Sequence, residues 1–206
     1  PGVDNYPPVG EGQISPSVCP DGYRGYAYRQ CANGQLGEVK MDMCRMKVPE
    51  NARYPRARYQ FVMNTQSQTD VATCKNIVTR WYMDEGVMLP EGLTLNERTG
   101  QISGIPTDTA DISSYTIYAE NDSGATSAII SISVRKGQCK AEGVFPVTEV
   151  DNLAEYQCSM QGSYIGTQKR ACMLGATDGE WQKASGYCMP VMMIVILVVV
   201  VIIIIV

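Results

Sequence analysis

The middle of the chain alternates apolar and polar residues in short runs, a pattern typical of β-strands with one buried face. Four of these runs are rich in β-branched and aromatic residues and are bounded by turn residues: 58–62, 77–82, 114–119 and 127–134. The last two runs are joined by Asn121-Asp122-Ser123-Gly124, a composition that favours a tight hairpin connection. Several short strands at this spacing predict a β-sandwich.

The end of the chain is continuously apolar. Residues 191–206 are all Val, Ile, Leu or Met, and as a helix they would be about 24 Å long. A core strand of that length would be unusual, whereas a helix satisfies all its own backbone polar groups in lipid. We therefore predict one transmembrane α-helix over residues 190–206, with Pro190 in its first turn and membrane lipid as its partner.

The cysteines belong to a repeated pattern. The segment Tyr-x-Gly-x3-Arg-x-Cys occurs at residues 23–31 and again at residues 164–172, and a further cysteine, Cys44 or Cys188, ends each copy. The second copy also contains Cys139, whose counterpart would fall just before Pro1, so we expect the sequence to be cut from a longer protein. The repeat predicts two small cysteine-rich modules, residues 1–47 and 137–189, each too small to bury a core without disulfides.

This pattern, with its Gly-x-Trp before the last cysteine, resembles the C-terminal half of sushi modules and the related hormone-receptor-like cysteine modules. The resemblance implies three disulfides: Cys19–Cys44, Cys139–Cys172 and Cys158–Cys188. The interval from Cys139 to Cys158 is shorter than sushi modules need, which makes the second module a truncated or divergent variant. Cys31 and Cys74 remain. Either they pair with each other, or, as truncation favours, Cys31 pairs with an upstream cysteine and Cys74 stays free.

The segment between the modules carries a second resemblance. Leu89-Pro-Glu-Gly-Leu93 is followed by Thr99-Gly-Gln-Ile-Ser-Gly-Ile-Pro106, and then by Tyr115-x-Ile117-x-Ala119. This order resembles the immunoglobulin-like family of bacterial and protist surface proteins, which lies near the cadherin-like sandwiches. The resemblance implies an Ig-like β-sandwich over residues 48–136 with a spacer, adhesion or scaffolding role. The residues expected to point inward are Leu93, Leu95, Ile102, Tyr115 and Ile117.

Cadherin-like relatives bind calcium between domains through acidic clusters. Solvated surface carboxylates are far commoner than calcium ligands, so we predict no metal site. The acidic residues that come into question are Glu50, Asp108, Asp111, Glu120 and Asp122.

Composition excludes several functions. The chain has no histidine, which removes Ser-His-Asp and Cys-His catalysis and the common His-containing zinc sites. Its net charge is −4, so it has no basic surface for nucleic acid. We predict that the protein is not an enzyme and has no cofactor. Asn121-Asp122-Ser123 is an N-glycosylation sequence on the predicted hairpin tip, and we predict a possible N-linked glycan at Asn121.

Together these features predict a mainly β chain, with an Ig-like sandwich between two disulfide-stapled modules and a C-terminal transmembrane helix. Because disulfides persist in oxidising compartments, the N-terminus is expected outside the cell, at a plasma or ciliary membrane. The predicted function is a membrane-anchored structural or adhesion protein whose partners are other membrane or extracellular proteins. The alternatives are an accessory single-pass subunit of a larger membrane complex, such as a channel or surface-filament anchor, and a ligand-binding receptor.

Overall fold

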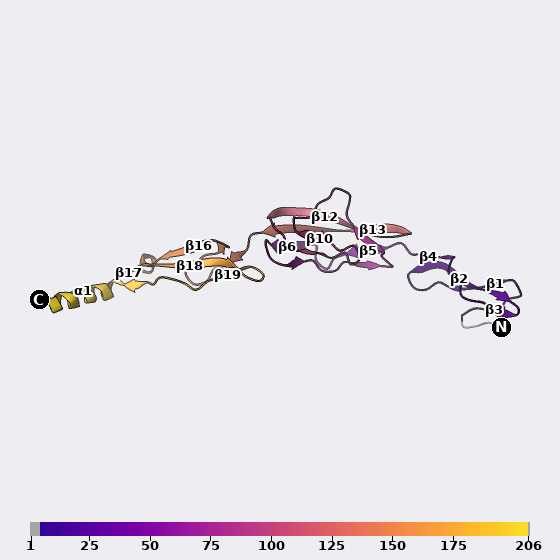
Figure 1. Ribbon diagram of the computed structural model, residues 1–206, viewed down its shortest axis with the longest axis horizontal. Helices are drawn as coiled ribbons and strands as arrows, with labels where there is room; N and C mark the ends of the chain where they lie inside the picture. The colour runs from indigo at the N-terminus through magenta and orange to yellow at the C-terminus, as the bar shows by residue number, and fades with distance from the viewer. Residues whose placement is uncertain (1–4, 206) are drawn as a thin grey trace.

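The computed structural model describes residues 5–205. The chain is mainly β-structure, as the sequence predicts, and is extended rather than compact (Figure 1). An N-terminal cysteine module, a central domain, a C-terminal cysteine module and one α-helix follow one another along its length.

The central domain is a β-sandwich. Its larger sheet has the strand order β6-β13-β12-β9, and its second sheet has the order β10-β11-β7, with a separate pair β5-β8 at one edge. β6 runs parallel to β13, whereas β13, β12 and β9 are antiparallel neighbours. The strands are β5 Glu50–Arg53, β6 Arg58–Val62, β7 Ser67–Gln68, β8 Thr73–Lys75, β9 Arg80–Tyr82, β10 Leu93–Leu95, β11 Ile102–Gly104, β12 Ala110–Asn121 and β13 Gly124–Arg135.

The core of this domain lies between the two sheets. Alternate side chains of β12 and β13 point into it, so that Ile117 and Ile132 are fully buried against Ile102 of the opposite sheet. Trp81 of β9 closes one side of the core. Of the five residues expected to point inward, four are buried, and Leu95 is partly buried against the core.

Three of the four predicted strands match β6, β12 and β13. The fourth, residues 77–82, forms a strand only at β9. Asn76 has a left-handed backbone (φ 71°), and the Ile77 carbonyl accepts a hydrogen bond from the Asn121 side chain instead of a neighbouring strand. The start of the predicted strand is therefore a turn.

The N-terminal module is a small antiparallel sheet built around β2, which pairs with β1, β3 and β4. The repeated motif lies on this central strand, at residues 23–31. The strands are β1 Ile14–Val18, β2 Tyr23–Ala32, β3 Gln35–Leu36 and β4 Cys44–Met46.

The C-terminal module repeats this arrangement around β18, which pairs with β16 and β19. Its other short pairs are β14-β15 and β17-β20. The elements are β14 Gln138–Cys139, β15 Thr148–Glu149, β16 Leu153–Gln157, the 3-10 helix η1 Cys158–Gln161, β17 Tyr164–Ile165, β18 Thr167–Leu174, β19 Gly179–Trp181 and β20 Met189–Pro190.

The apolar end forms α1, Val191–Ile205, but the prediction of a transmembrane helix over residues 190–206 is wrong. Within residues 5–205, no helix is long and apolar enough to cross a membrane. α1 has 15 residues, or about 22 Å at 1.5 Å per residue, against a hydrocarbon core of about 30 Å. Pro190 is not in the helix either, because it belongs to β20 and pairs with Tyr164.

Candidate functional site

The turn between β12 and β13 holds the segment that leads in from the N-terminal module. The Asn121 amide Nδ2 donates to the carbonyl oxygens of Lys47 and Ile77, both at 2.8 Å. The Ser123 hydroxyl donates to the Met46 carbonyl at 2.7 Å. The Asn121 side-chain oxygen accepts from the Ser123 backbone N–H at 2.9 Å, which fixes the turn itself. The end of β4 is thus bound directly to the central domain.

A second junction joins the central domain to the C-terminal module. Arg135, the last residue of β13, lies 2.6 Å from Asp178 between Nη2 and Oδ2, and its Nη1 donates to Oδ1 at 3.2 Å. The Asp178 carboxylate also accepts from the backbone N–H groups of Gln138 (2.7 Å) and Gly179 (2.8 Å). These donors, the Arg135 guanidinium foremost, lower the pKa of Asp178 to about 2. One carboxylate therefore connects both sides of the junction.

Apolar contacts tighten this second junction. A Cβ at Gly137 would lie 2.9 Å from Val150, 3.3 Å from Leu174 and 3.4 Å from Val62. Val62 belongs to the central domain, and the other two belong to the C-terminal module. No side chain larger than hydrogen fits at residue 137 without moving these neighbours, so the two units are in direct contact at Gly137.

The structure contains the disulfides Cys19–Cys44, Cys139–Cys172 and Cys158–Cys188, the same pairs that the resemblance to sushi modules implies. The backbone next to the last cysteine is also arranged in the same way in the two modules. Gly25 and Gly166 have φ values of 105° and 110°, and each approaches the carbonyl oxygen of the residue before the last cysteine, Met43 or Tyr187. The glycine of the repeated motif is required because any side chain there would strike this carbonyl.

The arginine of the motif lies over an aromatic ring in both modules. The Arg29 guanidinium lies 4.9 Å from the centre of the Tyr6 ring. The Arg170 guanidinium lies 5.3 Å from the Trp181 ring and 5.9 Å from the Phe145 ring. Trp181 also donates from Nε1 to the Lys140 carbonyl at 2.7 Å.

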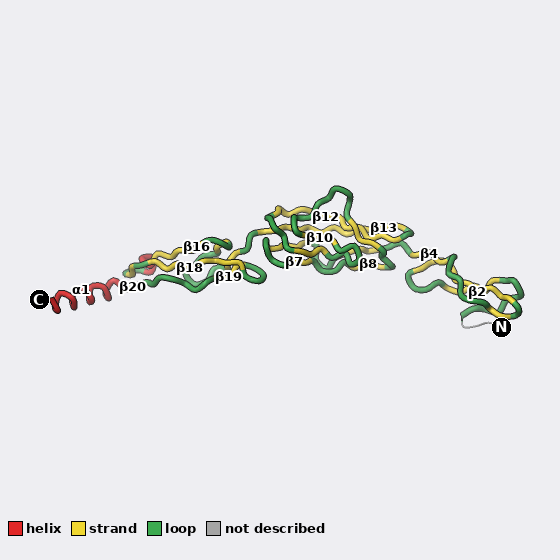
Figure 2. Tube along the Cα trace, viewed as in Figure 1, coloured by secondary structure: helices red, strands yellow, loops and turns green. Residues whose placement is uncertain are grey.

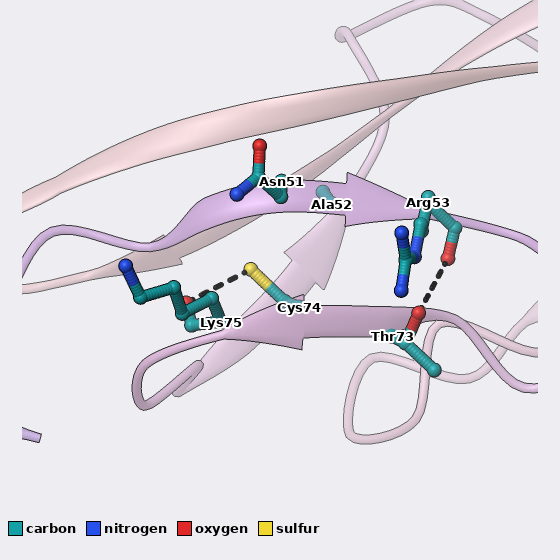
Figure 3. Close-up of a pocket in the computed structure, with 6 residues that line it drawn as sticks. All are labelled: Asn51, Ala52, Arg53, Thr73, Cys74 and Lys75. Atoms are coloured by element: carbon teal, nitrogen blue, oxygen red, sulfur yellow. Dashed lines mark hydrogen bonds between the residues drawn. The ribbon is translucent and has the colours of Figure 1, made fainter.

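An open pocket of about 500 Å³ lies over the β5-β8 pair, lined by Asn51, Ala52, Arg53, Thr73, Cys74 and Lys75 (Figure 3). The register of the pair shifts between Glu50 and Arg53. The Cys74 thiol points across the pair, and its sulfur lies 3.2 Å from the Glu50 carbonyl oxygen. Burial raises the pKa of this thiol, so Cys74 is protonated at neutral pH and is a poor nucleophile.

Cys31 and Cys74 are not bonded to each other or to any other described cysteine. Cys31 is buried on β2. Glu11, whose carboxylate accepts from the backbone N–H groups of Asn33 (2.7 Å) and Gly34 (3.0 Å), lies beside it.

The central domain is similar to a known protein family. Residues 47–135 match a family model described as "Putative Ig domain". The central domain is Ig-like. This confirms the immunoglobulin-like resemblance seen in the sequence. The match does not extend to the two cysteine modules, and their resemblance to sushi modules stays a prediction. No curated protein matches the chain.

Solved structures that are similar to parts of the chain include Ig-like and cadherin fragments. Human protocadherin-24 EC1-2 is 9% identical, with a TM-score of 0.39 over 70% of this chain and 97% of that one. An I-band fragment of titin is 13% identical, with a TM-score of 0.38 over 71% and 66%. A Bacteroides fragilis protein described as a "putative alpha-galactosidase" is 24% identical, with a TM-score of 0.35 over 44% of this chain. The match spans only 18% of that protein.

The glycosylation site predicted at Asn121 is not an exposed position in the structure. Asn121 is 8% exposed, and its amide donates to two carbonyl groups. The prediction of a glycan there assumed an exposed hairpin tip, and that assumption is wrong, because the incoming segment covers the tip.

The acidic residues considered for calcium are not brought together. Glu50 pairs with Lys75 at 3.1 Å, and Asp108 accepts from its neighbour Thr109. In the part of the chain that the structure describes, no group of three or more His, Cys, Asp or Glu residues could hold a metal ion.

Residues that sequence reasoning missed are the ones at the two junctions. Asp178 and Arg135 are 43 positions apart, and no local pattern connects them. For Asn121, the Asn-Asp-Ser-Gly turn was a visible signal, but it indicated a glycan rather than a contact between units.

Proposed function

We propose that this chain is an extracellular structural or adhesion protein whose three β units form a stiff rod at the cell surface. The observation that carries the proposal is the pair of hydrogen-bonded junctions at Asn121 and Asp178. Ordinary linkers leave neighbouring domains free to move. Here both connections are fixed by buried or partly buried polar contacts. A rod of this kind holds binding faces at a set distance from its base.

Three disulfides support the extracellular location, because such bonds persist in oxidising compartments. The Ig-like domain supports the structural or adhesive role by its fold alone. Its outward strands and those of the cysteine modules would meet other membrane or extracellular proteins.

We extend the proposal to membrane lipid as the partner of α1. All its residues are apolar and none of them is buried in the protein. Most of its side chains are half exposed or more. A helix that is apolar on every side has no face suited to water, and the hydrocarbon of a lipid layer is a medium that suits all its faces.

The location is tested with an epitope tag inserted after Glu85, in an exposed loop where a Cβ added at Gly86 would meet no atom within 4 Å. In cells that make the protein, the expected result is antibody labelling without permeabilisation. Labelling that requires permeabilisation would contradict an extracellular location. A tag at this loop leaves both junctions and all disulfides intact.

The partners are tested by crosslinking in the same cells. A lysine-reactive reagent probes the β units through Lys75, Lys136 and Lys183, and a photoreactive residue at Val195 probes α1. Extracellular proteins joined to the β units, with lipid joined at Val195, would support the structural or adhesion role. A membrane protein joined stoichiometrically at Val195 would instead favour an accessory subunit.

A further inference from the structure

The end of the C-terminal module next to α1 contains no charged residue. Residues 156–166 and 184–190 include neither Asp, Glu, Lys nor Arg. The nearest charges along the chain are Glu155, Lys169 and Lys183. Lys169, opposite Ser185, is paired with Glu155. The module therefore changes from a charged body to an uncharged tip.

The uncharged tip also exposes large apolar and aromatic side chains. Met160 of η1 is 78% exposed and Tyr187 is 69% exposed. Ile165 and Tyr164 of β17 are 47% and 36% exposed. We call these four residues, Met160, Tyr164, Ile165 and Tyr187, the collar.

The collar is connected to α1 by a strand pair, a hydrogen bond and a disulfide. β17 pairs with β20 through Tyr164 opposite Pro190 and Ile165 opposite Met189. The first N–H of α1, at Val191, donates to the Ser163 carbonyl at 2.9 Å. The disulfide Cys158–Cys188 ties η1 to the residue before β20. The helix therefore leaves the module directly at the collar, with no intervening linker (Figure 2).

We propose that the collar is a lipid-binding surface that rests in the headgroup region of a zwitterionic bilayer. This inference rests on the proposed contact of α1 with lipid, since β17 of the collar pairs with the two residues that precede α1. Tyrosine is favoured at membrane–water interfaces, where its ring is partly buried and its hydroxyl stays wet. Methionine and isoleucine add apolar area. Without a basic residue at this tip, attraction to anionic lipids has no part in the binding.

Binding of the collar to lipid would fix the orientation of the rod relative to the lipid surface. Because η1, β17 and α1 are connected by strand pairing and a disulfide, contact of the collar with headgroups beside the start of α1 would resist tilting of the module. The rod would then project from the lipid surface rather than lie along it.

The experiment uses the whole chain in vesicles of phosphatidylcholine that include a bromine-labelled phosphatidylcholine as a quencher of tryptophan fluorescence. Three variants each add one tryptophan: Met160→Trp in the collar, Ile196→Trp in α1 and Met88→Trp as a control. Met88 is 84% exposed and lies in the Ig-like domain, so it matches Met160 in type and exposure. The fluorescence of the unsubstituted protein, from Trp81 and Trp181, is subtracted.

The expected result is strong quenching of the added tryptophan at residues 160 and 196 and none at residue 88. Quenching at 196 but not at 160 would overturn the collar and leave the lipid contact of α1 standing. No quenching at either position would overturn the proposed lipid contact itself. Quenching at all three would mean that the rod lies flat on the vesicle, which also contradicts the collar.

A second measurement tests the same surface by substitution. The double variant with Met160→Trp and Tyr187→Asp is expected to show at least twofold weaker quenching than Met160→Trp alone, because a carboxylate resists burial among the headgroups, whereas adding Met88→Asp to Met160→Trp leaves the quenching unchanged. Quenching of Met160→Trp is expected to be the same at 50 mM and 500 mM salt. Equal quenching with and without Tyr187→Asp, or a steep fall with salt, would contradict the proposal. Retention of the Cys158–Cys188 disulfide shows that the variant is folded.

Discussion

The side-chain amide of Asn121 donates a hydrogen bond to the backbone carbonyl of Lys47, at 2.8 Å, across 74 positions of sequence. With the Ser123 hydroxyl on the Met46 carbonyl, it fastens the exit of the N-terminal module to the hairpin turn of the Ig-like domain. Two residues of the glycosylation sequence, Asn121 and Ser123, therefore form a structural joint.

Replacing Asn121 by Ala should loosen this joint. The substitution leaves the carbonyl groups of Lys47 and Ile77 without their donor, and an unpaired buried polar group costs about 1–3 kcal/mol. We expect a fall of that size in the free energy of unfolding of the Ig-like domain, measured by urea denaturation. Asp122→Ala, at the exposed neighbouring position, is the control and should have little effect. Equal stability of the two variants would show that the joint contributes nothing.

The Asp178 carboxylate should make the second junction sensitive to acid. Its pKa in the folded protein is about 2, below its ordinary value of 3.8. A lowered pKa means stability that is present above pH 4 and is lost as the pH falls toward 2. The difference corresponds to at most about 2.5 kcal/mol, and solvent around this partly exposed pair reduces it to about 1 kcal/mol.

Asp178→Asn should therefore be less stable than the unsubstituted protein at pH 6, and the gap should shrink between pH 4 and pH 2. Thermal unfolding across this range measures it. Glu180→Gln, which removes a nearby exposed carboxylate, is the control and should have little effect on stability at pH 6. A constant gap at all pH values would contradict the assigned role of the charge.

The repeated glycine can be tested against a close control in the same module. Gly166 and Gly162 have nearly equal φ values, 110° and 109°, but only Gly166 lies against a carbonyl oxygen, that of Tyr187. Alanine at either position would have a φ value that L residues rarely adopt, and at residue 166 it would also collide with the Tyr187 carbonyl. We expect Gly166→Ala to be less stable than Gly162→Ala by about 1–3 kcal/mol, with a lower yield of the Cys158–Cys188 disulfide by mass spectrometry. Similar yields would contradict this account.

The two unbonded thiols should differ in reactivity. Cys74 lines an open pocket, whereas Cys31 is 6% exposed. Iodoacetamide should alkylate Cys74 first. Because burial raises the pKa of the Cys74 thiol, its rate should keep rising above pH 9. Peptide mapping of the modified protein follows both sites, and faster modification of Cys31 would contradict the structure.

Much of the fold was predictable because the alternation of apolar and polar residues along a strand shows which side chains are buried. The alternating residues of β12 and β13 place Ile117 and Ile132 in the core, and Leu93 and Ile102 follow from the Ig-like motif. Strands such as β7, with only Ser67 and Gln68, are too short to show any period. They form because neighbouring strands provide hydrogen-bonding partners, as β11 does for β7. Which strands become neighbours is known only from the folded structure.

The candidate site was less predictable, because it consists of contacts between units. The apolar run after Pro190 correctly indicated a helix. The prediction that this helix spans a membrane was wrong, because α1 has only 15 residues. Pro190 belongs to β20 rather than to the helix, because it pairs with Tyr164 of β17, 26 positions earlier. Likewise, nothing local to Asp178 indicates Arg135. Such pairs become visible only when the path of the chain is known.

The most direct test of the stiff rod is a distance distribution across each junction. Nitroxide labels are placed at the exposed residues Glu38, Arg98 and Thr177 in two pairs, 38 with 98 and 98 with 177. Cys31 and Cys74 are replaced by Ser. Pulsed electron paramagnetic resonance then reports the width of each distribution.

The account predicts one narrow distance for each pair in the otherwise unsubstituted chain. It also predicts that Asn121→Ala broadens only the first pair and Asp178→Asn only the second. Broad distributions in the unsubstituted chain, no wider in either variant, would contradict the account by showing that the three units move freely on their connections.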